Sequence, residues 1–255
     1  MRDDAGSGPS AEVYVALGDS ISIDEYAGGP GRGAASLFFR NRDEDFPDWS
    51  GRDLVSRLGG GRVYVLAEDG APSGAIATHQ LHSVQMSGIT PTVATVTMGG
   101  NDLLGNFGDS PGARRAIDRV VANGHTILGG LRELMPPDAP IVVGTVYDPS
   151  DGTGDWSIQD LGPWPDVLDV LAELNQKLRT LAESNGALVA DIHPRFMGHG
   201  LAAGDTRQQE ARPADRNLWY CGLFEPNAWG ASEIRGAFWD AVEGHAEQPG
   251  PLIQS

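Results

Sequence analysis

A serine that directly follows an apolar run is the first residue in the sequence placed to do chemistry. Residues 13–17 are aliphatic or aromatic, and Gly18, Asp19 and Ser20 come next. If residues 13–17 form a buried strand, the Ser20 hydroxyl lies at the edge of a sheet. A helix that begins there would offer backbone N–H groups to an anionic intermediate. Gly-Asp-Ser also occurs in many turns and helix caps, so this tripeptide alone does not identify a nucleophile.

Two further apolar runs also end in glycine turns. Residues 62–66 lead to a turn at Gly70, where a backbone N–H can be offered without a side chain covering it. Residues 92–98 lead to Gly99-Gly100-Asn101, and the Asn101 amide is a donor of the kind that stabilises an oxyanion. We expect Asp102, the next residue, to be structural and to order its turn. Three such turns after three consecutive predicted strands indicate one shared site.

The elements that must position these turns follow from the hydrophobic pattern. Short, nearly continuous apolar runs predict parallel strands buried on both faces, at residues 13–17, 62–66, 92–98, 140–146 and, more weakly, 187–192. Apolar residues at helical spacing predict helices at 113–134, 166–185 and about 228–243. This alternation predicts one α/β domain over residues 1–255, with its core at about 12–243. Ligands bind such sheets at the carboxyl ends of the strands.

Two of these segments resemble sequence blocks of the SGNH/GDSL hydrolases. Residues 15–21 are similar to the nucleophile block, and residues 96–102 are similar to the Gly-x-Asn-Asp block. The resemblance extends from Val13 to about Trp239. It implies a flavodoxin-like three-layer α/β/α sandwich with a five-stranded parallel sheet. It also implies an ester hydrolase that works through an acyl-enzyme on Ser20.

The same resemblance implies an oxyanion hole. The three donors would be the N–H of Ser20, the N–H of Gly70 and the side-chain amide of Asn101. Gly74 is the second choice for the glycine. No cofactor and no metal are implied.

The last block departs from the family pattern. The family has Asp-x-x-His-Pro-Asn before its last helix, whereas this chain has Gly222-Leu-Phe-Glu225-Pro-Asn. Glu225 therefore stands where the histidine base is usual, and Gly222 stands where its orienting aspartate is usual. A base must come from elsewhere, because a serine at its free pKa is a poor nucleophile.

Several bases are consistent with the sequence. The interpretation that we favour is a Ser20–His199–Glu225 triad, since His199 lies in the loop that leaves the fifth predicted strand. His193, in the same loop, is the next candidate. Glu225 could itself be the base, which requires burial to raise its pKa, or it could merely cap the last helix. If no base is present, the chain would be a non-catalytic binding protein of the same fold.

The loops after the fourth and fifth strands carry further candidates. Asp148, Asp151 and Asp155 resemble a calcium loop in composition but lack the glutamate that closes the regular spacing, so we favour a substrate-facing lid. Four aromatic residues are expected to build an apolar acyl or aryl pocket: Trp156, Trp164, Trp219 and Tyr220.

Composition excludes several classes of partner. A formal net charge of −17 disfavours nucleic acid and anionic membrane surfaces. The single cysteine, Cys221, cannot form an intrachain disulfide, and we expect it to be structural. No apolar run reaches the roughly 20 residues of a membrane span, and the polar N-terminus lacks the apolar core of a signal peptide. We therefore expect a cytoplasmic enzyme that acts on a small ester.

Overall fold

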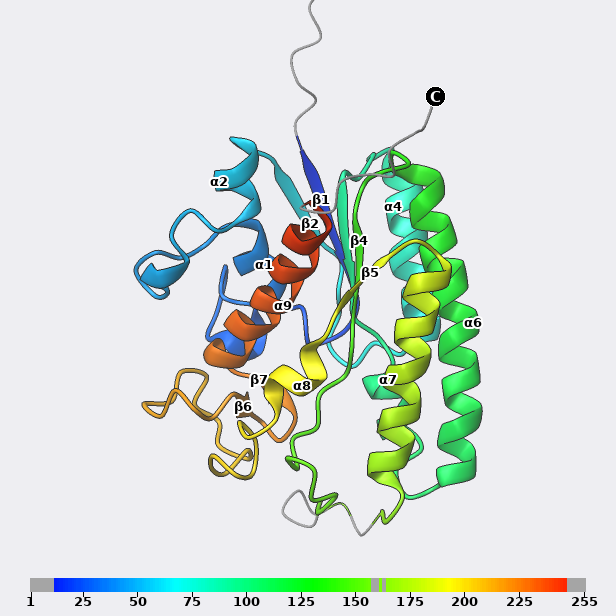
Figure 1. The fold of residues 1–255 in the computed structure, drawn as a ribbon, viewed down its shortest axis with the longest axis vertical. Helices are drawn as coiled ribbons and strands as arrows, with labels where there is room; N and C mark the ends of the chain where they lie inside the picture. Colours follow the sequence, from blue (N-terminus) through cyan, green and yellow to red (C-terminus); the bar gives the residue numbers. More distant parts are fainter. Residues whose placement is uncertain (1–11, 157–160, 162–163, 247–255) are drawn as a thin grey trace, which may run out of the picture.

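The computed structural model describes residues 12–156, 161 and 164–246. Its central sheet has five parallel strands in the order β2-β1-β3-β4-β5 (Figure 1). The strands are β1 (Val13–Leu17), β2 (Arg62–Val65), β3 (Val93–Val96), β4 (Ile141–Gly144) and β5 (Leu188–Ala190). This topology confirms the predicted flavodoxin-like fold, and each strand lies within its predicted range.

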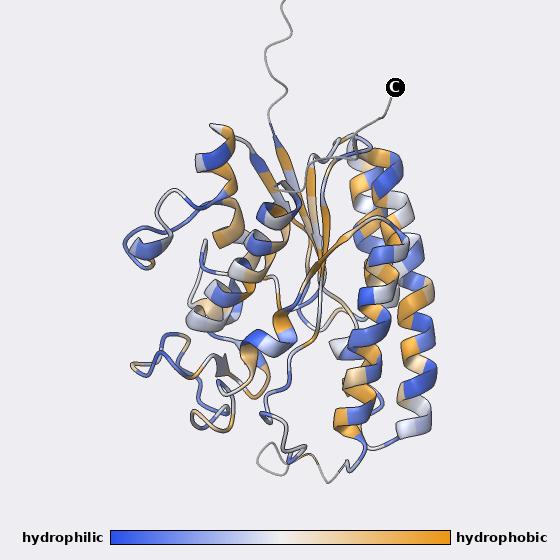
Figure 2. Cartoon of the chain, viewed as in Figure 1, coloured by the Kyte–Doolittle hydropathy of each residue, from blue (hydrophilic) through white to orange (hydrophobic). Residues whose placement is uncertain are grey.

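Helices cover both faces of the sheet (Figure 1). One face packs against α4 (Leu81–Ser87), α6 (Ser110–Leu134) and α7 (Val167–Ser184), and the other packs against α1 (Ala34–Phe39) and α9 (Ala228–Ala246). Side chains alternate between the two cores along each strand: Val13 and Val15 face α6, whereas Tyr14 and Ala16 face α1 and α9. Figure 2 shows the result, with largely hydrophobic strands between helices whose outer sides are hydrophilic.

The remaining elements are short. They are α2 (Leu54–Leu58), α3 (Ser73–Ala75), α5 (Gly100–Leu104), α8 (Ile192–Phe196), the 3₁₀ turns η1 (Glu25–Ala27) and η2 (Pro47–Trp49), the π-helical η3 (Ile76–Gln80), and an antiparallel pair, β6 (Tyr220–Cys221) and β7 (Glu225–Pro226). Most lie where the chain crosses between strands and helices. In the part of the chain that the structure describes, every helix is too short or too polar to cross a membrane.

The turn after β1 is fixed by an unusually close approach to the end of β3, at Thr97. Gly18 has φ +145°, and a Cβ placed on it would lie 2.1 Å from Thr97 Oγ1 and 2.7 Å from the Thr97 carbonyl oxygen. The buried Gln80 side chain accepts a hydrogen bond from the Gly18 N–H (2.7 Å) and donates one to the Gly18 carbonyl (2.8 Å). Thr97 Oγ1 also donates to Asp19 Oδ1 (2.9 Å). These contacts determine where Ser20 lies.

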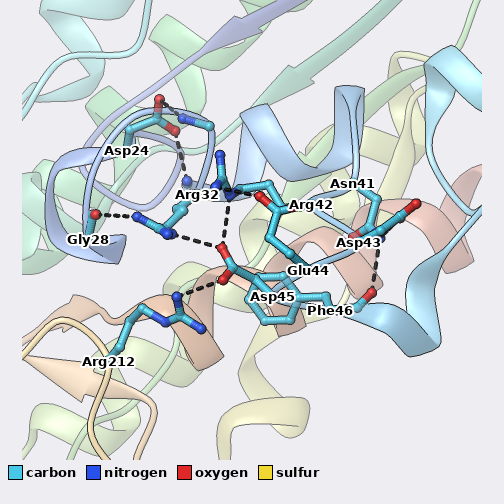
Figure 3. Close-up of polar contacts among 12 residues, drawn as sticks. Asp24, Gly28, Arg32, Asn41, Arg42, Asp43, Glu44, Asp45, Phe46 and Arg212 are labelled. Atoms are coloured by element: carbon cyan, nitrogen blue, oxygen red, sulfur yellow. Dashed lines mark hydrogen bonds and ion pairs between the residues drawn. The ribbon is translucent and has the colours of Figure 1, made fainter.

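An ion cluster around Asp45 joins two segments that flank the site (Figure 3). Arg32 and Arg42 each contact the Asp45 carboxylate at 2.9 Å, and Arg212 contacts it at 2.7 Å. Burial of Asp45 would raise its pKa, but the hydrogen bonds from the three guanidinium groups outweigh burial and lower the pKa to about 2. Arg32 belongs to the segment after β1, and Arg212 belongs to the segment before β6. The cluster therefore ties these two segments together.

The close approach at Gly18 can be tested against a glycine with the same backbone conformation. Gly60 also has φ +145°, but a Cβ there would meet nothing within 4 Å. Both alanine variants suffer backbone strain, and only Gly18→Ala also forces a clash with β3. We expect Gly18→Ala to lower the free energy of unfolding by about 2 kcal/mol more than Gly60→Ala, measured by urea denaturation. Equal losses in the two variants would contradict the close packing.

Candidate functional site

A cavity opens at the carboxyl ends of β1, β3 and β4, the edge of the sheet where the sequence predicts a ligand site. It encloses about 660 Å³ of space, a volume that includes the open solvent at its mouth. Its polar lining comes from Asp19, Ser20, Asn101 and Glu225. The rest of its lining is mostly apolar: Leu103, Leu104, Phe107, Val146, Trp156, Trp164, Val167, Leu171 and Phe224. The cavity thus brings together three of the predicted site residues.

Ser20 lies in a tight turn and is 7% exposed. The Ile21 N–H donates to Asp19 Oδ1 (3.2 Å), and the Ser22 N–H donates to the Asp19 carbonyl (3.1 Å). The prediction that a helix begins at Ser20 is wrong, because the first helical residues after it are those of η1, Glu25–Ala27. These short-range bonds, rather than a helix terminus, orient the backbone around Ser20.

Glu225 lies beside Ser20 at the start of β7. The Ser20 hydroxyl is within hydrogen-bonding reach of the Glu225 carboxyl group, whose Oε2 is buried with no partner. Burial raises the pKa of Glu225 to about 7, the interaction with the Ser20 hydroxyl works against this rise, and the nearby charges of Asp69, Asp19 and Glu25 add to it. A carboxyl group with this pKa exchanges its proton near neutral pH.

The turn between β6 and β7 sets the position of Glu225. In the antiparallel pair of β6 and β7, Glu225 lies opposite Cys221. The N–H groups of Gly222 and Leu223 donate to carbonyls of an adjacent loop (2.9 Å each), and Tyr147 Oη donates to the Phe224 carbonyl (2.6 Å). This hairpin was not predicted, because a two-residue strand has no periodicity to detect.

Glu225 does not cap the last helix. That helix, α9, begins at Ala228, and Asn227 Oδ1 accepts hydrogen bonds from the N–H groups of Trp229 (2.9 Å) and Gly230 (3.2 Å). Asn227 is therefore the capping residue, as its side chain and position would favour. Glu225 therefore has no capping role, and it lines the cavity.

Asp19 is a second carboxyl group with a perturbed pKa at the cavity. Burial raises the pKa of Asp19 to about 6, against hydrogen bonds from Thr97 and from the Ile21 backbone that lower it. Its Oδ1 already accepts those two hydrogen bonds, so Asp19 holds the turn. Of the two carboxyl groups, Glu225 is the one connected to the Ser20 hydroxyl.

Asn101 lies in the first turn of α5 and lines the cavity with Ser20. One hydrogen of its amide is donated to the Ala71 carbonyl (3.3 Å), a long bond that holds the side chain loosely. Asp102 accepts hydrogen bonds from the Ser73 N–H (2.9 Å) and the Ser73 hydroxyl (2.8 Å). Asp102 is structural as predicted, but its carboxylate holds Ser73 of α3 and not its own turn.

Neither glycine proposed for the oxyanion hole lines the cavity. Gly70 lies in an exposed turn after β2 with φ +68°, and Gly74 lies in α3. Both belong to the segment whose Ala71 carbonyl binds Asn101. The structure therefore places this segment next to the site without placing either glycine in the wall of the cavity.

The structure does not bring His199 to Ser20. The His199 ring stacks on Trp219, with centroids 3.5 Å apart, and its Nδ1 bonds to the Asn217 carbonyl at 2.8 Å. These residues line a second cavity, together with Trp49 and Trp229, and Ser20 and Glu225 are not part of its lining. The flanking glycines are also held, because the Gly198 and Gly200 N–H groups donate to the Asp151 carboxylate (2.8 and 3.0 Å).

His193 also lies outside the lining of the first cavity. It is on α8, where its Nδ1 bonds to the Val146 carbonyl (3.1 Å) and its backbone N–H donates to Thr145 Oγ1 (3.0 Å). These bonds hold the imidazole against the end of β4. Its role in the structure is to attach α8 to the sheet.

The acidic loop after β4 uses its carboxylates within the protein. Asp148 accepts hydrogen bonds from the N–H groups of Ser150 (2.9 Å) and Gly152 (2.7 Å), and Asp151 holds the loop that contains His199. Among the described residues, no group of three or more His, Cys, Asp or Glu side chains could hold a metal ion. These bonds give the two aspartates a structural role.

The predicted aromatic pocket is half correct. Trp156 and Trp164 line the cavity beside Ser20. Trp219 instead lies under His199, and Tyr220 packs against Tyr147 with ring centroids 5.1 Å apart. The loop before β6 turns away from the first cavity. Trp219, which lies in this loop, therefore does not line that cavity.

Solved structures of other proteins share this fold. Axe2, an acetylxylan esterase from Geobacillus stearothermophilus, superposes with a TM-score of 0.61 at 16% identity over 91% of this chain and 94% of that chain. LAE5, an alpha/beta hydrolase enzyme from the metagenome of Lake Arreo in Spain, gives a TM-score of 0.54 at 18% identity over 92% and 97% of the two chains. At these identities the likeness supports the fold alone.

Sequence comparison gives the family. No curated protein shows a significant match to the sequence. The sequence does match the GDSL-like lipase/acylhydrolase family over residues 16–231, a range that begins in β1, contains Ser20, Asn101 and Glu225, and ends in α9. The chain therefore belongs to the GDSL-like lipase/acylhydrolase family.

Proposed function

We propose that this protein hydrolyses carboxylic esters through an acyl-enzyme on Ser20, with Glu225 as the general base. One observation carries the proposal: the Ser20 hydroxyl lies in the same cavity as a buried carboxyl group, within its hydrogen-bonding reach, and burial raises the pKa of that carboxyl to about 7. A base is most effective when its pKa is near the working pH, and it must be within hydrogen-bonding reach of the proton that it removes. Glu225 meets both conditions.

The proposed reaction has two steps. The ionised Glu225 carboxylate takes the proton of the Ser20 hydroxyl as its oxygen attacks the ester carbonyl carbon. The Asn101 amide and backbone N–H groups stabilise the resulting oxyanion. When this tetrahedral intermediate collapses, the alcohol leaves and receives the proton from Glu225. Glu225 then takes a proton from water as the water oxygen attacks the acyl carbon. The bond between Ser20 Oγ and the acyl carbon breaks, the acid leaves, and Glu225 returns the proton to Ser20 Oγ.

A carboxylate base also explains why two residues of the usual family block differ together. An imidazole base needs a partner that fixes its tautomer and stabilises its charged form. A carboxylate has no tautomer to fix and becomes neutral when it takes the proton. With Glu225 in place of the histidine, an orienting aspartate has no function, and Gly222 occupies its position with φ +55° in the hairpin turn.

The nucleophile is tested with Ser20→Ala. We expect this variant to lose hydrolysis of p-nitrophenyl hexanoate by more than about a thousandfold while its thermal unfolding is unchanged, because the hydroxyl is needed for the chemistry. A fluorophosphonate probe should label the wild type and not the variant. A wild type that resists the probe and leaves every ester intact would instead be a binding protein of this fold. Retention of more than about a tenth of kcat in Ser20→Ala would exclude Ser20 as the nucleophile.

The oxyanion donor is tested with Asn101→Ala. Since the amide is used mainly in the transition state, kcat should fall by roughly 10² to 10³ with little change in KM. Asn106→Ala is the matched control, because Asn106 lies on the same segment and its amide bonds to the Asp102 carbonyl, outside the cavity. An effect on KM alone in Asn101→Ala would place this amide in substrate binding.

The base is tested by comparing Glu225→Gln with His199→Ala. Only ionised Glu225 can accept the proton, so the kcat/KM of the wild type should rise tenfold per pH unit below about 7 and level off above it. Glu225→Gln should lose at least about a hundredfold in activity and lack this rise. His199→Ala should stay within about threefold of the wild type at every pH. A loss in His199→Ala as large as that in Ser20→Ala would support the Ser20–His199–Glu225 triad instead.

A further inference from the structure

We infer that the apolar cavity beside Ser20 binds the acyl group of the ester and selects a medium-length or aryl acyl group over acetyl. This inference rests on the function proposed above and names the class of its substrate. It also separates this chain from Axe2, which shares the fold and is an acetylxylan esterase.

The first step is to decide which half of the ester occupies the cavity. Glu225 must deliver a proton to the leaving alcohol, so the alcohol has to lie on the side of Glu225. Acidic and polar groups surround that side: the charges of Asp69 and Glu25 act on Glu225, and Tyr26 Oη donates to Asp69 at 3.1 Å in an exposed position. The alcohol therefore leaves through a polar region that is open to water. The acyl group extends to the other side of Ser20, into the apolar part of the cavity.

Packed aromatic rings form the first wall of that apolar part. The Phe107 ring lies 5.0 Å from Trp164 and 5.9 Å from Trp156, and Trp156 lies 5.4 Å from Phe224, measured between centroids. Trp164 Nε1 donates to Ser110 Oγ (2.8 Å), which fixes the orientation of the indole ring. Rings held in this way keep the cavity open and preformed.

Aliphatic side chains contribute the rest of the apolar lining. Leu103 and Leu104 come from α5, and Val167 and Leu171 come from adjacent turns of α7. None of these walls contributes a charged side chain, and the unpartnered polar atom among their side chains is the buried Trp156 Nε1, so a charged acyl group would lose its hydration without gaining a counter-charge. The cavity is thus suited to hydrocarbon.

The extent of the apolar lining decides between short and longer acyl groups. An acetyl group has one methyl to bury, whereas the apolar lining continues from Ser20 over side chains of α5, of α7 and of the loops that carry Phe107, Trp156 and Trp164. Each further methylene that enters the apolar part should raise kcat/KM by about three- to fourfold until the cavity is filled. An aryl acyl group would gain from the ring edges of Phe107 and Trp164 as well as from burial.

The direct test is a series of p-nitrophenyl esters with the wild-type protein, in which only the acyl chain changes. We expect kcat/KM to increase by at least about tenfold from acetate to hexanoate. A series in which acetate is best, or in which chain length has no effect, would overturn the inference while leaving the proposed ester hydrolysis intact. If no ester is cut, or if Ser20→Ala cuts them all equally well, the proposed function itself fails, and the assignment of the cavity to an acyl group fails with it.

Two valines on α7 provide a matched pair of variants. Val167 lines the cavity, whereas Val170 is fully buried in the same core and does not line it. Val167→Phe fills the cavity and should reduce the octanoate-to-acetate ratio of kcat/KM by at least about tenfold. Val167→Ala enlarges the cavity and should shift the best substrate to a longer acyl chain. This variant also tests the inference if Val167→Phe does not fold. Val170→Ala should lower stability and leave the ratio unchanged; an equal shift in both alanine variants would contradict the inference.

Discussion

In the mechanism that we propose, the chemistry depends on the contact between the Ser20 hydroxyl and the Glu225 carboxyl group. Burial raises the pKa of that carboxyl to about 7, and the neighbouring charges of Asp69, Asp19 and Glu25 add to the rise. The same burial that makes the charged form costly makes the group a proton acceptor of suitable strength at neutral pH. In an exposed position, Glu225 would have an ordinary carboxyl pKa and would be a much weaker base.

The scaffold brings the two residues together from distant parts of the sequence. Ser20 follows β1 and is held there by Gln80 and Thr97, which bond to Gly18 and Asp19. Glu225 lies on the β6–β7 hairpin, which the Tyr147 hydroxyl contacts after β4. The Asp45 cluster then joins the segments that lead from β1 and toward β6 (Figure 3). The position of the carboxyl group therefore depends on packing that spans most of the chain.

The sequence predicts the sheet well and the position of His199 poorly, for physical reasons. Buried parallel strands are short apolar runs, so their positions can be read locally, and the residues that follow them lie at one edge. Ser20 and Asn101 can be placed in this way. The position of His199 depends on contacts between loops: its stacking on Trp219 and the hold of Asp151 on its flanking glycines. No local pattern encodes these contacts, nor the burial that raises the pKa of Glu225.

The most direct test of the central claim is a titration of the Glu225 carboxyl group by NMR, in protein labelled with ¹³C at the side-chain carboxyl of glutamate. The Glu225→Gln variant identifies the signal. The account predicts that this carboxyl titrates with a midpoint of about pH 7 and that the midpoint rises further in Ser20→Ala, because the interaction with the Ser20 hydroxyl lowers the pKa. A midpoint near that of an ordinary glutamate, about 4.3, would contradict the account.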